Sequence, residues 1–387
     1  MTATAPDPSV PDSSLSPFAH LIAIHPLGLL YGSAGPFLSP ENLVGQAGAS
    51  FPPQAATVSG MFAAQYGNKS VQSLQLAGPF WAKTETVTHN ENQDFYVPTP
   101  MTCLVKKGEN TISNTLNWQE KDGRSSWRDR NGEIPTGKFE SGTWLSLKNW
   151  NSFHLQQVSG VGKDKPWKFV PHLHPRLELD QRRVAAGRAE LGPEETNQGS
   201  LFLENAVQLN SDCCLVYLSS QELPPGWYRF GGEGHMVEVT CHPLQDHIRR
   251  DLLSPPSLGR ALATITPAVW GSNRLSQRYP EAWRDLVTLS DSSCVGVKES
   301  ILTAKPIPFR YRLGNRKDDQ GQDIHQPHQP KLLSRGRYGV PAGSVYVLKD
   351  PLDQPWHLWP PQWFPKEGPY MNRWGCGLAL ALPSAIA

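Results

Sequence analysis

The stretch ASFPPQAATVSGMFAAQYGNK, residues 49–69, decides the fold of the N-terminal half of the chain. Two prolines precede a run of small and hydroxyl residues, and no charge occurs before the last residue. Apolar residues recur at helical spacing over 58–62, Thr57 or a neighbour is the expected N-cap, and Gly67 is the expected C-terminal cap. The stretch therefore predicts a short helix with a small, uncharged first turn.

Such a first turn allows two interpretations. Backbone N–H groups at a helix start lack partners, and small neighbours let a phosphate approach them at the positive end of the helix dipole. Alternatively, the small residues only allow an ordinary buried helix to pack closely against its neighbours.

Working outward, HLIAIHPLGLLYG (residues 20–32) predicts a first strand that runs into a glycine-rich loop over 32–56. GSLFLENAVQLN, CCLVYLSS and WYRFGGEGHMVEV predict further antiparallel strands, the last with a glycine turn. After residue 245, ALATITPAVW, YPEAWRDLV, CVGVKESIL and GSVYVLK repeat the order strand, short helix, strands, and RWGCGLALAL predicts a final strand.

The predicted fold class is α+β, with two small strand-helix-strand units and long loops. Residues 1–17 are expected to be a disordered tail and 18–245 a first domain with a basic, tryptophan-containing insertion around 105–170. A second domain with a glycine-rich C-terminal turn is expected over 246–387.

Composition narrows the function classes. The chain has 387 residues, 38% hydrophobic and 18% charged, with 36 prolines, 33 glycines and a net charge of +1. These values indicate a loop-rich folded protein without a global field toward nucleic acid or membrane. Two segments are nevertheless basic, with fifteen basic against ten acidic residues over 105–190 and nine against three over 301–349. Such segments suit either a solvated face or a ribose-phosphate groove.

Six cysteines without a C-x-x-C pair favour a reducing compartment. The first residues lack a basic leader and an apolar core, and the apolar C-terminal run is too short to span a bilayer. We therefore expect a cytoplasmic protein without a membrane contact.

Motifs for cofactor or metal chemistry are weak. No Walker A loop or dinucleotide fingerprint occurs, and His172 with His174 fits no standard zinc spacing. No cofactor, metal or catalytic residue is predicted. For a metal-free ribonuclease, His25 at the end of the first strand is the best-placed general base, but the sequence identifies no partner for it.

Three glycine-rich turns, FGGEGH (230–235), SRGRYGVPAGS (334–344) and RWGCGLA (373–379), could let the backbone approach a ribose-phosphate chain. Basic and aromatic residues also interleave in WRDR, KPWKF and FRYR, which suits base stacking as well as core packing.

Taken in order, HLIAIHPLGLLYGSAGPF, FPPQAATVSGMFAA, GSLFLENAVQL, GGEGH, ALATITPAVW, VPAGSVYVL and GLALA resemble a CRISPR-associated RAMP-superfamily protein. The resemblance is to the 5′-handle-binding subunit of type III-B (Cmr) effector complexes. It covers most of residues 20–380, apart from a divergent part over about 70–167. FPPxxxTVxG and VPAGSVY are its most specific pieces.

The resemblance implies two packed ferredoxin-like (RRM-type, RAMP) domains and no cleavage activity. It implies a ribonucleoprotein role in antiviral defence: the chain would hold the crRNA 5′ handle and contact the large polymerase-like CRISPR subunit and the first RAMP backbone subunit. Relatives often carry an Arg-Asp pair after the first strand, which YGSAGPF lacks, and a longer proline run than this chain has.

From these considerations, the expected RNA contacts use backbone amides, glycine turns and cationic or hydroxyl side chains. The candidates are Ser33, Thr57, Ser59, Lys69, Arg176, Arg182, Arg183, Arg335, Arg337 and Arg373. The alternative is a metal-independent repeat-RNA endoribonuclease that uses His25. A tryptophan-rich carbohydrate-binding protein would predict secretion and disulfides, and the sequence indicates neither.

Overall fold

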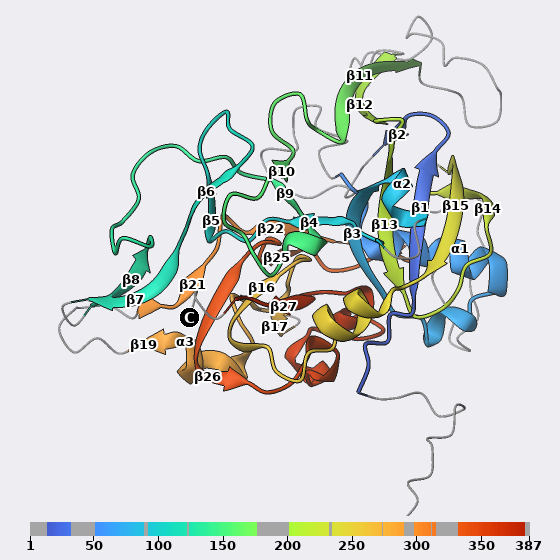
Figure 1. The fold of residues 1–387 in the computed structure, drawn as a ribbon. Helices are drawn as coiled ribbons and strands as arrows, with labels where there is room; N and C mark the ends of the chain where they lie inside the picture. The colour runs from blue at the N-terminus through green and yellow to red at the C-terminus, as the bar shows by residue number, and fades with distance from the viewer. Residues whose placement is uncertain are drawn as a thin grey trace, which may run out of the picture.

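The computed structural model describes residues 14–31, 51–88, 92–121, 124–175, 201–231, 234–272, 274–289, 298–310, 312–314 and 332–383 (Figure 1). Strands dominate, so the α+β class is confirmed with few helical residues.

The largest sheet has eight antiparallel strands in the order β10-β9-β4-β3-β13-β1-β15-β14. In chain order these are β1 (His20–Pro26), β3 (Leu76–Lys83), β4 (Tyr96–Pro98), β9 (Trp144–Ser146), β10 (Val158–Ser159), β13 (Cys213–Ser219), β14 (Gly226–Phe230) and β15 (His235–Pro243). The predicted strands over HLIAIHP, CCLVYLS and the WYRF…HMVEV hairpin are confirmed. β4, β9 and β10 are short additions from the divergent middle of the chain.

Helix α1 (Ala55–Tyr66) follows β1 and packs on one face of this sheet. Val58, Met61 and Phe62 are buried against Ile22 and Ile24 of β1, as the helical spacing predicts. The expectation of Thr57 as N-cap is wrong. The N-cap is Gln54, because its extended backbone (φ −66°, ψ 156°) is the last before helical geometry begins.

Gly67 ends α1 as predicted, and its N–H donates to the carbonyl of Ala63 at 2.9 Å. Its φ of +84° lies where glycine is favoured.

A second sheet has four antiparallel strands in the order β21-β26-β16-β27. They are β16 (Gly259–Thr264), β21 (Ile301–Leu302), β26 (Val345–Leu352) and β27 (Ala379–Ala381). Numbered along the chain, they lie in the order second, third, first, fourth. Four consecutive strands of the first sheet, β3-β13-β1-β15, have the same order.

A short helix also follows the first strand of the second sheet: α3 (Arg284–Val287) lies between β16 and β21. Between the third and fourth strands, the described residues form β14 in one sheet and 3₁₀ turns at Trp356–Leu358, Pro361–Trp363 and Met371–Trp374 in the other. Neither sheet therefore shows, in its described residues, the second crossover helix of a complete ferredoxin-like unit. Two ferredoxin-like domains stay a prediction.

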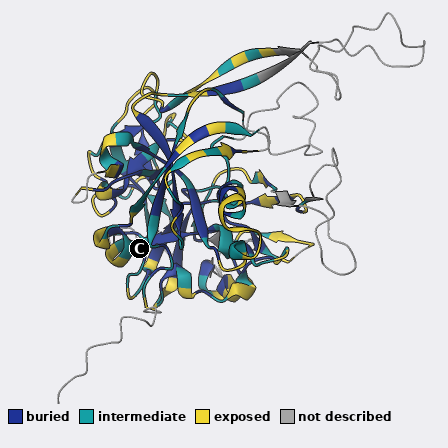
Figure 2. Cartoon of the chain, turned by 90° about the vertical axis from the view of Figure 1, so that its right-hand side faces the viewer, coloured by how far each residue is buried: buried dark blue, intermediate teal, exposed yellow. Residues whose placement is uncertain are grey.

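Smaller elements decorate the two sheets. A ribbon of β11 (Trp167–Pro175), β12 (Leu201–Leu209) and β2 (Leu30–Tyr31) projects from the body, and Figure 2 shows it with much exposed surface. Among the other elements are α2 (Thr84–Thr88) and the paired strands β5 (Cys103–Val105) with β6 (Ile112–Thr115), β7 (Asn117–Lys121) with β8 (Arg124–Arg128), β17 (Trp270–Gly271) with β18 (Ser276–Gln277), β19 (Thr288–Leu289) with β20 (Lys298–Glu299), β22 (Ile307–Phe309) with β25 (Arg337–Gly339), and β23 (Arg312–Gly314) with β24 (Leu332–Leu333). Within the basic insertion, β7 and β8 pair as antiparallel strands.

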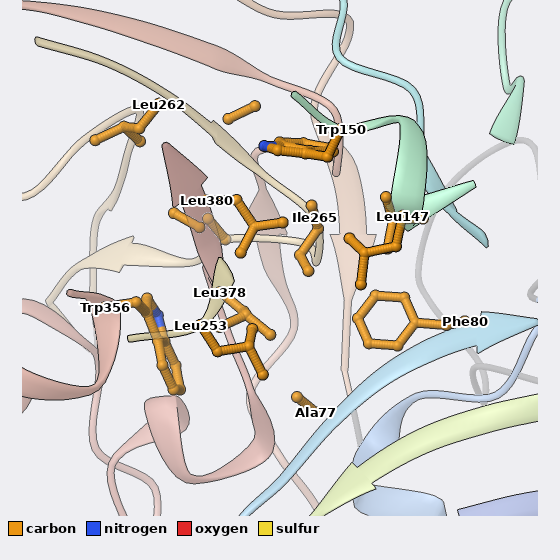
Figure 3. Packing of buried hydrophobic residues seen from close by; sticks show 14 of the residues in the cluster. Ala77, Phe80, Leu147, Trp150, Leu253, Leu262, Ile265, Trp356, Leu378 and Leu380 are labelled. Carbon is orange, nitrogen blue, oxygen red and sulfur yellow. The ribbon is translucent and has the colours of Figure 1, made fainter. Parts of the chain in front are cut away.

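One apolar core joins the two sheets. Figure 3 shows Ala77 and Phe80 of β3 facing Ile265 and Leu378 of the C-terminal half. The indole N–H of Trp150 also donates to the carbonyl of Ala381 at 2.7 Å. The two halves therefore bury apolar surface against each other.

Gly375 sets how closely the two halves approach. Its φ is +69°, and a Cβ there would lie 2.5 Å from the Cα of Ala77. Only glycine permits both this backbone and this contact.

We predict that Gly375→Ala lowers the free energy of unfolding by about 3 kcal/mol, through strain of about 1–2 kcal/mol and overpacking of similar size. Gly259→Ala is the matched control, because Gly259 has φ +68° and no atom within 4 Å of an added Cβ. Denaturant unfolding of both variants measures the difference. Equal destabilisation of the two variants would show that the contact with Ala77 contributes nothing.

Candidate nucleic-acid interface

The start of α1 carries positive electrostatic potential that the helix itself does not neutralise. Gln54 makes no side-chain capping hydrogen bond, and the first turn has no acidic residue. The N–H of Thr57 donates to the carbonyl of Gln54 at 2.9 Å. Because the first N–H groups of a helix have no intrahelical acceptor, an anion at this end is stabilised.

The residues before α1 are held from two sides. The ring of Phe51 packs edge-on against Trp167 of β11, with centroids 5.1 Å apart. The hydroxyl of Tyr217 donates to the carbonyl of Pro53 at 2.6 Å, and burial raises the pKa of this phenol far above its usual range. Tyr217 is therefore a neutral donor at all ordinary pH values, and it fixes where α1 begins.

A small pocket opens between the start of α1 and the C-terminal half. Its lining comprises Gln54, Ala55, Ala56, Gly78, Thr266, Pro267, Phe309, Trp374, Gly375 and Cys376. Two stretches that the sequence singled out, the helix start and the turn RWGCGLA, therefore meet although they lie about 320 residues apart. The buried Oε1 of Gln54 accepts no hydrogen bond from the described part of the chain.

Arg373 holds this turn in place. Its Nε donates to the carbonyl of Leu74 at 2.8 Å, and its guanidinium carbon lies 4.9 Å from the ring centroid of Trp374. The half-buried arginine thus links the first half to the pocket wall and adds a positive charge beside it.

The other candidates near α1 are spread along the helix. Thr57 lies in the first turn and is half-buried, while the hydroxyl of Ser59 donates to the carbonyl of Ala56 at 2.6 Å. Lys69 is exposed beyond the C-terminal end of α1, roughly 18 Å from its start for a twelve-residue helix. The structure therefore does not bring Lys69 to the helix start.

The two arginines of the turn SRGRYGV have different environments. The guanidinium of Arg337 is buried and pairs with the buried carboxylate of Glu367 at 2.8 Å. Arg335 is exposed, and its backbone N–H donates to the same carboxylate at 3.0 Å. Arg337 thus holds the turn, and only Arg335 has the exposure that a phosphate contact requires. Ser33, Arg176, Arg182 and Arg183 lie outside the described residues.

A cluster that the sequence analysis missed surrounds the turn FGGEGH. The side chain of Arg229 lies over Gly234, with Nη1 3.5 Å from the position of an added Cβ. Tyr31 shares a hydrogen bond with Nδ1 of His172 and packs against His235 of the turn at 4.9 Å between centroids. These side chains come from four separate strands, so no local motif could have predicted their meeting.

His25 is half-buried on β1, directly across from Glu238 of β15. Burial lowers the pKa of its imidazole, the Glu238 carboxylate opposes this shift, and His242 adds to it. His25 is therefore mostly neutral at pH 7, as a general base must be. Within the described ranges, no group of three or more His, Cys, Asp or Glu side chains could hold a metal, and no helix is long and apolar enough to cross a membrane.

A family model described as CRISPR-associated protein (Cas_Cmr3) matches residues 22–384. The chain belongs to this family. No curated protein matches it. Among solved structures, this Cmr3-family chain is similar to a subunit of the type III-B Cmr-beta complex bound to cognate target RNA, with 12% identity, 85% of this chain and 86% of that chain covered, and a TM-score of 0.40.

It is also similar to a chain of the Csm1–Csm4 cassette in complex with AMPPNP, with 10% identity, coverage of 86% and 89%, and a TM-score of 0.29. A third similarity is to a chain of the Csm3–Csm4 subcomplex of the type III-A CRISPR-Cas interference complex, with 9% identity, coverage of 87% and 94%, and a TM-score of 0.32. The family resemblance predicted from sequence is therefore confirmed by the family model.

Proposed function

We propose that this chain is a non-catalytic RNA-binding subunit of a type III CRISPR effector complex that holds the 5′ handle of the crRNA. Membership of the Cmr3 family supports this role. The observation that carries it is the start of α1, which has no capping side chain and no acidic residue and opens on a pocket beside Gly375.

RNA backbone fits this junction for three physical reasons. The helix start offers N–H donors and positive potential, the glycine turn keeps side chains out of the way, and Arg373 adds a fixed cation. The ring of the half-buried Trp374 in the pocket lining can stack on a base. Backbone contacts would hold the handle along the mouth of this small pocket.

We also propose that the two sheets derive from two ferredoxin-like domains. The matching strand orders of the two sheets, with a helix after each first strand, support an origin as two ferredoxin-like units of the RAMP type. In this role the chain helps to anchor the large polymerase-like subunit and contacts the first RAMP backbone subunit.

Thr57→Glu is expected to separate protein stability from RNA binding. A carboxylate in the first turn of α1 stabilises the helix by about 0.3–1 kcal/mol, whereas it repels a phosphate at the same place. We expect the affinity for a single-stranded RNA with the repeat-derived 5′ end to fall about tenfold, or about 1.4 kcal/mol. Fluorescence anisotropy at fixed salt measures it.

Thr57→Gln is the control, since it has the size of glutamate without the charge and should bind RNA like the parent chain. Unchanged RNA affinity of Thr57→Glu, together with a raised melting temperature, would rule out a phosphate at the helix start.

The alternative activity is cleavage of repeat RNA with His25 as general base. We expect labelled repeat RNA to stay intact during incubation with the purified chain in EDTA, because burial lowers the pKa of His25 and of its neighbour His242, which leaves neither imidazole protonated as a general acid at neutral pH. Cleavage that His25→Ala abolishes would contradict the non-catalytic assignment.

A further inference from the structure

The strand β14 forms one edge of the eight-stranded sheet, and Figure 1 shows it at the rim. It pairs with β15 from Gly226–Val239 to Phe230–His235. Among the described residues, no backbone group other than those of β15 pairs with it. An edge strand presents a row of N–H and C=O groups that can hydrogen-bond another strand.

β14 lacks the proline, the bulge and the very short length that often prevent strand addition. The opposite edge, β10, is only two residues long. The edge strand β11 of the ribbon carries Lys168 and Pro171. β14 has the sequence GWYRF and pairs with β15 without a bulge. Its edge is regular and open.

The side chains next to this edge are apolar and exposed. Trp227 is 71% exposed, and on the same face of β15 Met236 is 41% exposed. Leu27, whose N–H donates to the carbonyl of Met236 at 3.2 Å, is 52% exposed. Three large apolar side chains exposed near one edge of a sheet are typical of an interaction site. The opposite face of β14, with Tyr228 and Phe230, packs over the core beneath α1.

The charges on this face favour a protein over RNA. Exposed Glu238 lies between Trp227 and His25 in the same cross-strand row, where it would repel a phosphate backbone. Arg229, two residues from Trp227 on the same face, is exposed and complements a carboxylate. Tryptophan, methionine and arginine are enriched at protein interfaces.

We propose that β14 accepts an extended segment of another protein chain. The segment adds as a ninth strand along Gly226–Phe230, with a large apolar side chain facing Trp227 and an acidic side chain facing Arg229. The inference depends on the proposed function only in that the partner is another subunit of the same effector complex.

Hydrogen exchange tests the added strand. Amides of residues 226–230 are compared between the isolated full-length chain and the complex purified with all its subunits. We expect exchange of the outward-facing amides to slow at least about tenfold in the complex, because a new ladder protects them. Trp227→Glu should restore the fast exchange, while Leu275→Glu, at a site 63% exposed elsewhere, should not. Equal exchange in both states would overturn the proposal.

Photo-crosslinking identifies the occupant. A benzoylphenylalanine at position 227 should give one crosslinked peptide from another protein subunit. An adduct with RNA, with the same chain or with a second copy would overturn the inference. Trp227→Glu should also leave the RNA affinity of the isolated chain unchanged. The outcome for Trp227→Glu does not depend on the outcome for Thr57→Glu. Failure of the strand-addition proposal can therefore be distinguished from failure of the RNA-binding proposal.

Discussion

The packing of Gly375 against Ala77 is the contact on which the rest of the arrangement depends. It brings the turn after Met371–Trp374 onto β3 with no room for a side chain. Around it, residues of β3, β16, β26 and β27 share one apolar core, so neither sheet has to cover its inner face alone. Burial of this area, at about 25 cal/mol per Å², favours a fixed relation between the two halves.

The packing of the two halves determines which residues surround the start of α1. In an isolated first domain, this helix would begin at the surface and water would satisfy its N–H groups. Here the turn at Gly375 and Trp374 forms one wall of a pocket at the helix start. The N–H donors at the start of the rigid helix are thus held where a ligand, rather than a side chain of the protein, can accept their hydrogen bonds. The same sheet uses its two faces differently, since α1 covers one while the other is open near β14.

Local patterns predicted much of the fold. Runs of β-prone residues identified β1, β13 and the β14–β15 hairpin, and Gly67 marked the end of α1, because these features depend on neighbours in sequence. The short strands β4, β9 and β10 could not be predicted, because two or three residues carry no periodicity. The helix start was misplaced since Gln54 caps it through backbone geometry alone.

The candidate site was less predictable because its parts meet through tertiary structure. Arg337 looked like Arg335 in sequence, but Glu367, thirty residues later, neutralises it in the interior. Arg229 and the Tyr31–His172 pair could not be predicted because their partners come from distant strands.

The most direct test of the central claim is the structure of the full chain bound to single-stranded RNA with the repeat-derived 5′ end. We predict a phosphate within hydrogen-bonding distance of the backbone nitrogens of Ala55 and Ala56, beside Gly375. RNA bound elsewhere, with this junction unchanged, would contradict it.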